Sequence, residues 1–147
     1  MKSIRFAVAA SAALLCGSAF AANFAETKSS DDLWIQSSKS GYSVEYVGKG
    51  DVAGLQFDIY DSSIAEGNYS CGASLASTHI ASCNLHEKEG FLRVVIFSLS
   101  NAALSDSSLV QVTTGSANSF AQTKSSASLK NVIFSDNKGQ NVTPEHL

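Results

Sequence analysis

The sequence predicts an all-β protein, an antiparallel β-sandwich formed by a single domain. Short apolar stretches recur along the chain, and Gly, Ser, Asn and Asp residues typical of turns separate them. Proline, which interrupts the hydrogen bonding of a sheet, occurs once, as Pro144 near the C-terminal end. No stretch has the periodicity of a sustained amphipathic helix, although residues 101–110 are compatible with one short helical turn.

Several stretches carry the strand pattern clearly. In residues 52–61, apolar and polar side chains alternate, so we expect one side of this strand to face the core and the other to face outward. Residues 91–99 are almost continuously apolar, which predicts a central strand covered on both faces, or nearly so. The predicted strands are residues 33–36, 42–47, 52–61, 91–99, 109–113 and 129–134.

The N-terminal residues have the pattern of a cleavable secretory signal peptide. Lys2 and Arg5 precede an apolar stretch that is too short to cross a bilayer as a helix. Ala19 and Ala21 then provide the small residues that signal peptidase requires, so we expect residues 1–21 to be removed. The protein is therefore expected to be exported, to the periplasm or to the extracellular space.

The remaining residues suit one domain with a single core. We expect residues 22–31 to form a flexible lead-in, residues 32–142 the domain, and residues 143–147 a C-terminal tail. Loss of Lys2 and Arg5 lowers Lys plus Arg from 10 to 8 against 13 Asp plus Glu, so the net charge becomes −5. This acidic balance argues against a nucleic-acid partner, and no later stretch is apolar enough to span a membrane.

The three cysteines become a pair, Cys71 and Cys83, once the signal peptide leaves with Cys16. An even pair in an exported domain is interpreted first as a disulfide. The alternative is a zinc site that combines this pair with His79 and His86, but the spacing matches no close-paired zinc motif and an oxidising compartment favours the disulfide. A lipid on Cys16 is disfavoured by the bulky leucines that precede it.

Residues 52–61 resemble the third-strand motif of cohesin domains, the family that holds dockerin modules in cellulosomes. In that family an Ala-Gly-x-Gln-Phe segment leads into a Tyr-Asp pair, and the matching residues here are Ala53, Gly54, Gln56, Phe57, Tyr60 and Asp61. Residues 129–140 resemble the family's last strand and its Asp-Asn-x-Gly turn, and residues 90–99 with 108–112 resemble its paired strands. The resemblance covers residues 32–142 and implies an antiparallel jelly-roll β-sandwich of about nine short strands.

The side chains that carry chemistry do not form the pattern of an active site. A hydrolase needs a positioned nucleophile and base or two facing carboxylates, and neither His79 nor His86 has such a partner nearby in the sequence. Asp58 and Asp61 are candidate calcium ligands, although Asp61 is better explained as the first residue of a turn with the serines that follow it. We therefore expect a non-catalytic protein without a cofactor or a bound metal.

The expected outward side of residues 52–61 is the candidate binding face. It presents Gln56, Asp58 and Tyr60, and we place Arg93 of the apolar stretch 91–99 on the same face. A tyrosine among polar side chains suits a protein partner or stacking on a sugar ring, whereas Trp34 is interpreted as a packing residue. A solvated sheet face without a ligand is the alternative.

The sequence thus predicts an exported binding module whose partner is a protein, either dockerin-like or another protein of the cell envelope. The first alternative is a carbohydrate-binding module that takes a polysaccharide. The second is a small structural protein of the cell envelope with no discrete ligand.

Overall fold

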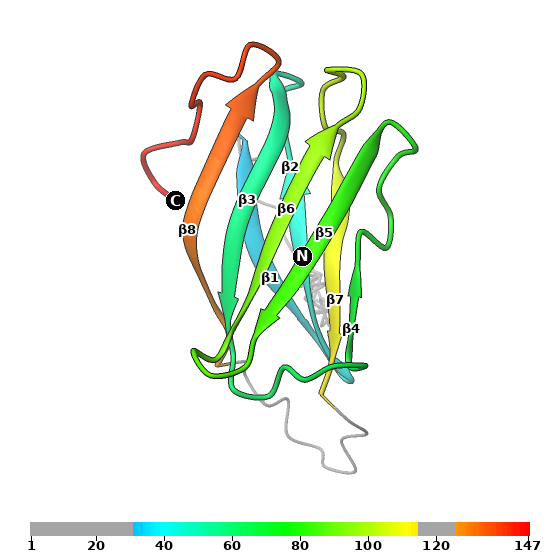
Figure 1. The fold of residues 1–147 in the computed structure, drawn as a ribbon, viewed down its shortest axis with the longest axis vertical. Helices are drawn as coiled ribbons and strands as arrows, with labels where there is room; N and C mark the ends of the chain where they lie inside the picture. The colour runs from blue at the N-terminus through cyan, green and yellow to red at the C-terminus, as the bar shows by residue number, and fades with distance from the viewer. Residues whose placement is uncertain (1–30, 115–125) are drawn as a thin grey trace, which may run out of the picture.

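The computed structural model describes residues 31–114 and 126–147, and the regular secondary structure of these residues is entirely β. Eight strands pair in the antiparallel sense and form two four-stranded sheets (Figure 1). The back sheet, in the order β1-β2-β7-β4, contains β1 (Asp32–Ser38), β2 (Gly41–Val47), β7 (Ser107–Thr113) and β4 (Tyr69–Cys71). The front sheet, in the order β5-β6-β3-β8, contains β5 (His79–His86), β6 (Phe91–Ser98), β3 (Val52–Tyr60) and β8 (Ser128–Asp136). The predicted all-β, antiparallel architecture is confirmed.

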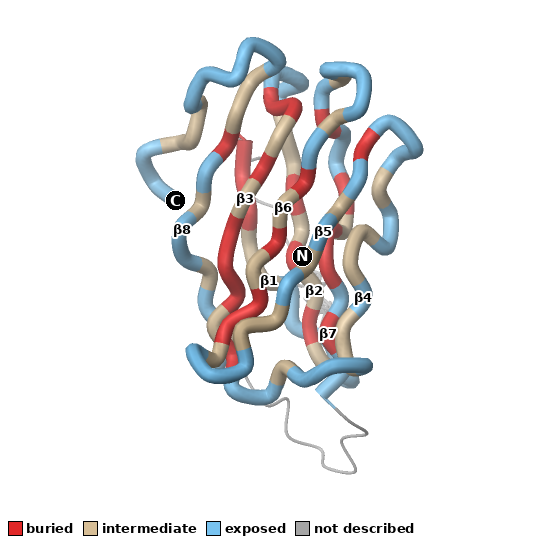
Figure 2. The backbone as a smooth tube through the Cα atoms, viewed as in Figure 1, coloured by how far each residue is buried: buried red, intermediate tan, exposed pale blue. Residues whose placement is uncertain are grey.

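The core lies between the two sheets, where the inward side chains of both are buried (Figure 2). The alternation predicted for β3 is confirmed on this side, because Leu55, Phe57 and Ile59 all face the core. Burial of such apolar surface is the dominant favourable contribution to folding. The front sheet contributes Leu55, Phe57, Ile59, Leu92, Val94, Ile96 and Phe134, and the back sheet contributes Leu33, Val44, Tyr46, Leu109, Val110 and Val112.

Strand β6 differs from the prediction in one respect. It lies between β5 and β3, so its predicted central position is right. The predicted cover, or near cover, on both faces is wrong at Phe97, which is out of phase with the buried Val94 and Ile96 and keeps 42 % of its surface exposed. Residues 101–110, which were compatible with one short helical turn, form none, since β7 begins at Ser107 and no helix precedes it in this segment.

Two strands that the sequence analysis did not predict, β4 and β5, lie at neighbouring edges of the two sheets (Figure 1). The predicted disulfide is confirmed and connects them, with Cys71 at the end of β4 and Cys83 in the middle of β5. It is therefore a covalent link between the back sheet and the front sheet. Because the two sulfur atoms are bonded to each other, the zinc alternative for this pair is wrong.

The folded domain begins at least one residue earlier than predicted. Asp31, placed by the sequence analysis in the lead-in, is buried, and its Oδ1 accepts hydrogen bonds from the Tyr46 hydroxyl at 3.1 Å and from the Lys49 N–H at 2.8 Å. Burial and the Asp31 carboxylate raise the pKa of Tyr46 well above its ordinary value, so this hydroxyl stays a donor. The predicted signal peptide and residues 22–30 lie outside the described residues.

The C-terminal residues pack against both sheets. The backbone N–H of Phe134 in β8 donates to Thr143 Oγ1 at 2.7 Å, and His146 Nε2 lies 3.8 Å from Asp32 Oδ1 at the start of β1. The predicted boundary at residue 142 therefore falls inside a segment that contacts the sandwich. The described residues include no helix that is long and apolar enough to cross a membrane.

Candidate functional site

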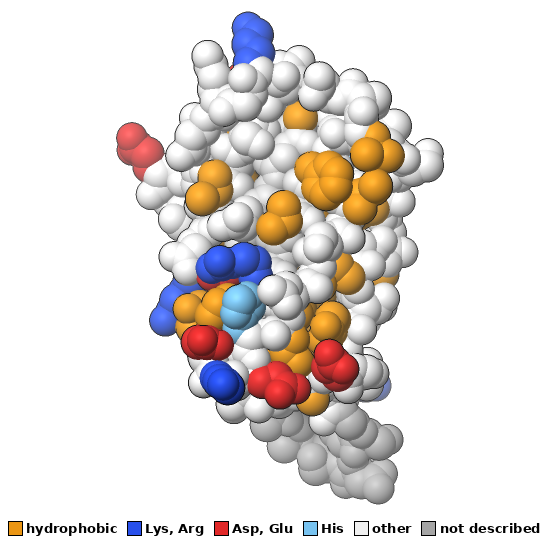
Figure 3. Space-filling view, viewed as in Figure 1, with side chains coloured by type: hydrophobic (Ala, Val, Ile, Leu, Met, Phe, Trp, Pro, Cys, Tyr) orange, Lys and Arg blue, Asp and Glu red, His pale blue; other side chains and the backbone are white. Residues whose placement is uncertain are grey.

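The candidate site is the outer face of the front sheet, which is the side turned away from the core and toward the viewer in Figure 3. The antiparallel register sets side chains of the four strands opposite one another in transverse rows. One row consists of Asn84, Arg93, Asp58 and Lys130. The next row consists of His86, Phe91, Tyr60 and Ser128. The structure thus places the predicted residues Gln56, Asp58, Tyr60 and Arg93 in adjacent rows of one face.

Asp58 is the centre of a hydrogen-bonded cluster on this face. Arg93 holds the carboxylate with two donors, since Nε donates to Oδ1 at 2.8 Å and Nη2 donates to Oδ2 at 2.7 Å. Asn131 Nδ2 also donates to Oδ2, at 2.7 Å. The Asp58 side chain is fully buried by these contacts, and the hydrogen bonds from Arg93 are the main reason why its pKa lies below the ordinary value of 3.8.

Asn131 reaches Asp58 because β8 is irregular at this point. The register between β3 and β8 shifts between Gln56 and Asp58, and Asn131 has a φ of 52°. Asparagine tolerates this left-handed conformation better than most residues, and a bulge turns the side chain toward a new neighbour. The bulge also interrupts the regular edge of the sheet, which disfavours pairing with a strand of another chain.

Asp58 consequently positions other side chains and does not offer its carboxylate to a ligand. The outward direction predicted for it is right, but its expected place on the accessible surface is wrong because Arg93 covers it. Asp61 accepts the backbone N–H of Ser63 at 2.9 Å and its hydroxyl at 2.8 Å, as expected of a turn residue. The part of the chain that the structure describes contains no group of three side chains suited to hold a metal ion.

Replacing Asp58 by asparagine is expected to lower the free energy of unfolding by about 2 kcal/mol at pH 7, because charge-assisted hydrogen bonds are lost. The folded-state pKa of Asp58 is depressed, so its stabilisation is present above the unfolded-state pKa and is lost as the pH falls through the folded-state value. The difference between wild type and variant should therefore shrink below about pH 4. Urea unfolding at pH 7 and at about pH 2.5 measures both effects. Exposed Glu66→Gln is the control, and an undiminished difference at low pH would contradict the assignment.

A stacked row of rings crosses the same face. The rings of His86 and Phe91 lie 4.4 Å apart and nearly parallel, and those of Phe91 and Tyr60 lie 5.1 Å apart. The Lys130 ammonium lies 4.5 Å from the centre of the Tyr60 ring. The Arg93 guanidinium lies 5.3 Å from the centre of the Phe91 ring. Cross-strand ring pairs and cation–π contacts stabilise the sheet. They also cover both flat sides of Tyr60, so this ring does not offer an open flat face.

An apolar patch adjoins the charged rows. We define it as Ile80, Phe97, Ile133 and Leu99, whose exposed fractions are 43 %, 42 %, 44 % and 63 %. Ile80 is paired with Phe97 across β5 and β6, and Ile133 is paired with Gln56 across β8 and β3, toward the other edge of the same sheet. Figure 3 shows apolar side chains over the upper half of this face, whereas Lys, Arg, His and acidic side chains gather over the lower half together with further apolar ones. Exposed apolar side chains gathered in this way mark interaction surfaces in folded proteins.

Sequence reasoning missed this patch for two reasons. Ile80 lies in β5, whose polar positions hid the strand, and Phe97 was assigned to a strand covered on both faces. A signal was nevertheless present, because Leu92, Val94 and Ile96 define the inward phase of β6 and Phe97 falls on the opposite phase. Trp34, in contrast, belongs to β1 of the back sheet and does not contribute to the outer face of the front sheet.

The histidines lie in separate places. His79 is buried at the start of β5, with its Nδ1 2.9 Å from the Thr78 hydroxyl. His86 stacks on Phe91, and His146 lies near the start of β1. Each imidazole therefore has a local contact, although the buried Nε2 of His79 has no hydrogen-bond partner among the described residues.

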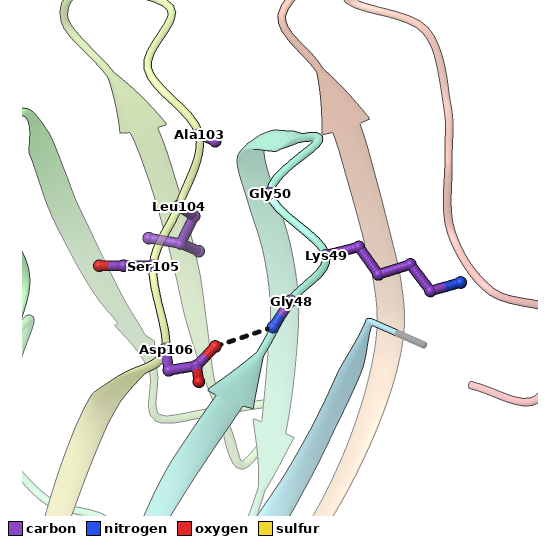
Figure 4. Close-up of a pocket in the computed structure, with 7 residues that line it drawn as sticks. All are labelled: Gly48, Lys49, Gly50, Ala103, Leu104, Ser105 and Asp106. Carbon is purple, nitrogen blue, oxygen red and sulfur yellow. Dashed lines mark hydrogen bonds between the residues drawn. The ribbon is translucent and has the colours of Figure 1, made fainter. Parts of the chain in front are cut away.

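A hollow lies at one end of the sandwich, between the turn after β2 and the loop after β6 (Figure 4). Its volume is about 470 Å³, and it is open to solvent. Asp106 Oδ1 accepts the backbone N–H of Gly48 at 3.1 Å, so part of its hydrogen-bonding capacity is already used. None of the predicted site residues is among those that line it, which are Gly48, Lys49, Gly50, Ala103, Leu104, Ser105 and Asp106.

Comparison with known proteins does not identify a family. The chain matches no protein-family model, and a search of the curated proteins finds none with significant sequence similarity.

Proposed function

We propose that this chain is an exported, non-catalytic binding module that holds a protein partner on the outer face of its front sheet. The observation that carries the proposal is the apolar patch, because exposed large apolar side chains on an otherwise solvated sheet face suit a protein interface. The polar and charged rows beside the patch provide the rim that such interfaces have. Export rests on the signal-peptide pattern of residues 1–21, and the disulfide is consistent with an oxidising compartment.

We also propose that the domain is a jelly-roll sandwich of the cohesin type. The residues that resemble the family's third-strand motif form β3, and those that resemble its last strand form β8 and the turn after it. Most connections, including β2 to β3, β3 to β4, β4 to β5 and β6 to β7, pass from one sheet to the other. Such crossings are typical of double-sheet jelly rolls.

The arrangement of the rings favours a protein over a polysaccharide. Sugar-binding surfaces present flat ring faces on which a pyranose can stack, whereas the Tyr60 ring lies between Phe91 and the Lys130 ammonium. Phe91 is covered by Tyr60 on one side and by His86 on the other. The carbohydrate-binding alternative therefore lacks the platform that Tyr60 was expected to supply.

Site-specific photo-cross-linking in the producing cells tests the proposal. A photoreactive phenylalanine analogue at position 97 or 133 should cross-link one discrete protein, because both positions lie in the apolar patch. The same analogue at the exposed position Gln111, in β7 of the back sheet, is the matched control and should yield no such product. Equal cross-linking from position 111, or polysaccharide binding that Tyr60→Ala abolishes, would contradict the proposal.

A further inference from the structure

The outer face of the front sheet has a charged end, around Asp58, and an apolar end, which is the apolar patch. Asp58 is paired with Arg93, so these two side chains neutralise each other. Lys130 is exposed, stands beside Asp58 in the same row, and forms no ion pair with any residue in the ranges 31–114 and 126–147. Its ammonium is held over the Tyr60 ring at 4.5 Å. Among the described residues, Lys130 is therefore a cation of this face that lies over a ring and has no carboxylate partner.

From this arrangement we infer that the partner contributes a protein segment in which a carboxylate side chain binds Lys130 while neighbouring apolar side chains cover Ile80, Phe97 and Ile133 of the apolar patch. The inference rests on the proposed function and adds the chemistry of the partner to it. A carboxylate is the complementary group, because an ammonium held against a ring and close to an apolar surface gains more from an ion pair than a mobile one in water. Arg93 supplies a second donor group, since its Nη1 makes no hydrogen bond to the described residues.

The spacing of the rows limits what such a segment can be. Along β3, Asp58 lies opposite Lys130, Gln56 opposite Ile133, and Gly54 opposite Phe97. At about 3.3 Å per residue, the row of Ile133 lies about 7 Å from the row of Lys130 and the row of Phe97 about 13 Å from it. An extended segment can therefore contact Lys130 with an acidic residue and the apolar patch with apolar residues two and four positions away from it. A helix covers the same distance in about nine residues at 1.5 Å each.

A random 12-residue peptide library displayed on phage, panned against the purified mature chain, is the probe for this inference. Enriched peptides are expected to contain Asp or Glu close to apolar residues. Synthetic copies should bind Lys130→Gln at least tenfold more weakly than wild type, while Lys130→Arg retains binding. Lys88→Gln removes the same charge from the exposed turn between β5 and β6 and is the matched control, expected to leave binding unchanged.

A charge exchange makes the assignment specific. A peptide whose acidic residue is replaced by lysine should bind Lys130→Glu better than it binds wild type, and the circular dichroism of each variant confirms that it is folded. Peptides that lose binding with Phe97→Ser but not with Lys130→Gln would overturn this inference and leave the proposed function intact. Peptides whose binding is unchanged by both substitutions would overturn the inference and the proposed function. Polygalacturonate binding that Lys130→Gln abolishes, without peptide enrichment, would overturn the inference in favour of an acidic polysaccharide.

Discussion

Replacing Phe134 by alanine should lower the free energy of unfolding by about 4 kcal/mol. This is the largest effect that we expect from any single substitution in the core between the two sheets. Phe134 is fully buried although it belongs to β8, an edge strand of the front sheet. Its ring meets that of Tyr46 from the back sheet at 5.8 Å in an edge-to-face arrangement. The substitution removes this contact and leaves a cavity between the two sheets. Urea unfolding followed by the fluorescence of Trp34, the single tryptophan, measures the loss.

Ile133→Ala is the matched control, because it alters the adjacent residue on the opposite side of the same strand. Ile133 is exposed in the apolar patch, so its truncation should cost less than about 1 kcal/mol of stability. The same variant should reduce cross-linking or peptide binding at the outer face. Equal losses of stability for the two variants would contradict the assignment of inward and outward phases in β8.

The inward phase of the strands could be predicted because it depends on local alternation. In β3 the buried Leu55, Phe57 and Ile59 follow a period of two, and the structure confirms their direction. For β6 the same reasoning failed in part. Its continuous apolar character suggests cover on both faces, whereas the outward Phe97 is exposed and belongs to an interaction surface. A continuous apolar stretch shows that both faces of a strand are apolar, but it does not show whether another part of the protein covers each face.

The candidate site could be predicted only as a set of residues that share a face. Which of them pair depends on the register between strands that are distant in the sequence, and the alternation within one strand carries no information about that register. Asp58 lies opposite Arg93 and therefore becomes buried in an ion pair instead of forming an accessible surface. The contribution of Asn131 was hidden for the same reason, because it depends on a bulge in β8.

Strand β5 was missed because its outward positions are occupied mostly by polar residues. Ala81, Cys83 and Leu85 face the core only partly, and a small or sulfur-containing residue gives a weaker pattern than valine or phenylalanine. The disulfide, by contrast, could be predicted without any knowledge of β4 or β5. Once Cys16 is assigned to the signal peptide, Cys71 and Cys83 are the only pair that remains.

Replacing both Cys71 and Cys83 by alanine should lower the free energy of unfolding by about 3 kcal/mol, because the disulfide no longer restricts the 13-residue ring in the unfolded chain. Strand β4 should respond most, since it has three residues and pairs only with β7 within its sheet. Gly72, which follows it with a φ of 70°, lets the chain turn close to Ala81, where an added Cβ would meet the Ala81 Cβ at 2.9 Å. Without the covalent link, this close contact between the sheets rests on weak packing alone.

Urea unfolding with and without a reducing agent measures the effect of the disulfide, and hydrogen exchange at residues 69–71 locates it. Wild type should fall to the stability of the double alanine variant when reduced, while the variant itself should not respond to the reductant. Because Ile80 of the apolar patch lies in the same strand as Cys83, we also expect weaker peptide binding in the variant. An unchanged unfolding midpoint on complete reduction would show that the two sheets hold their edges together without the disulfide, and binding through Ile80 would then be independent of it.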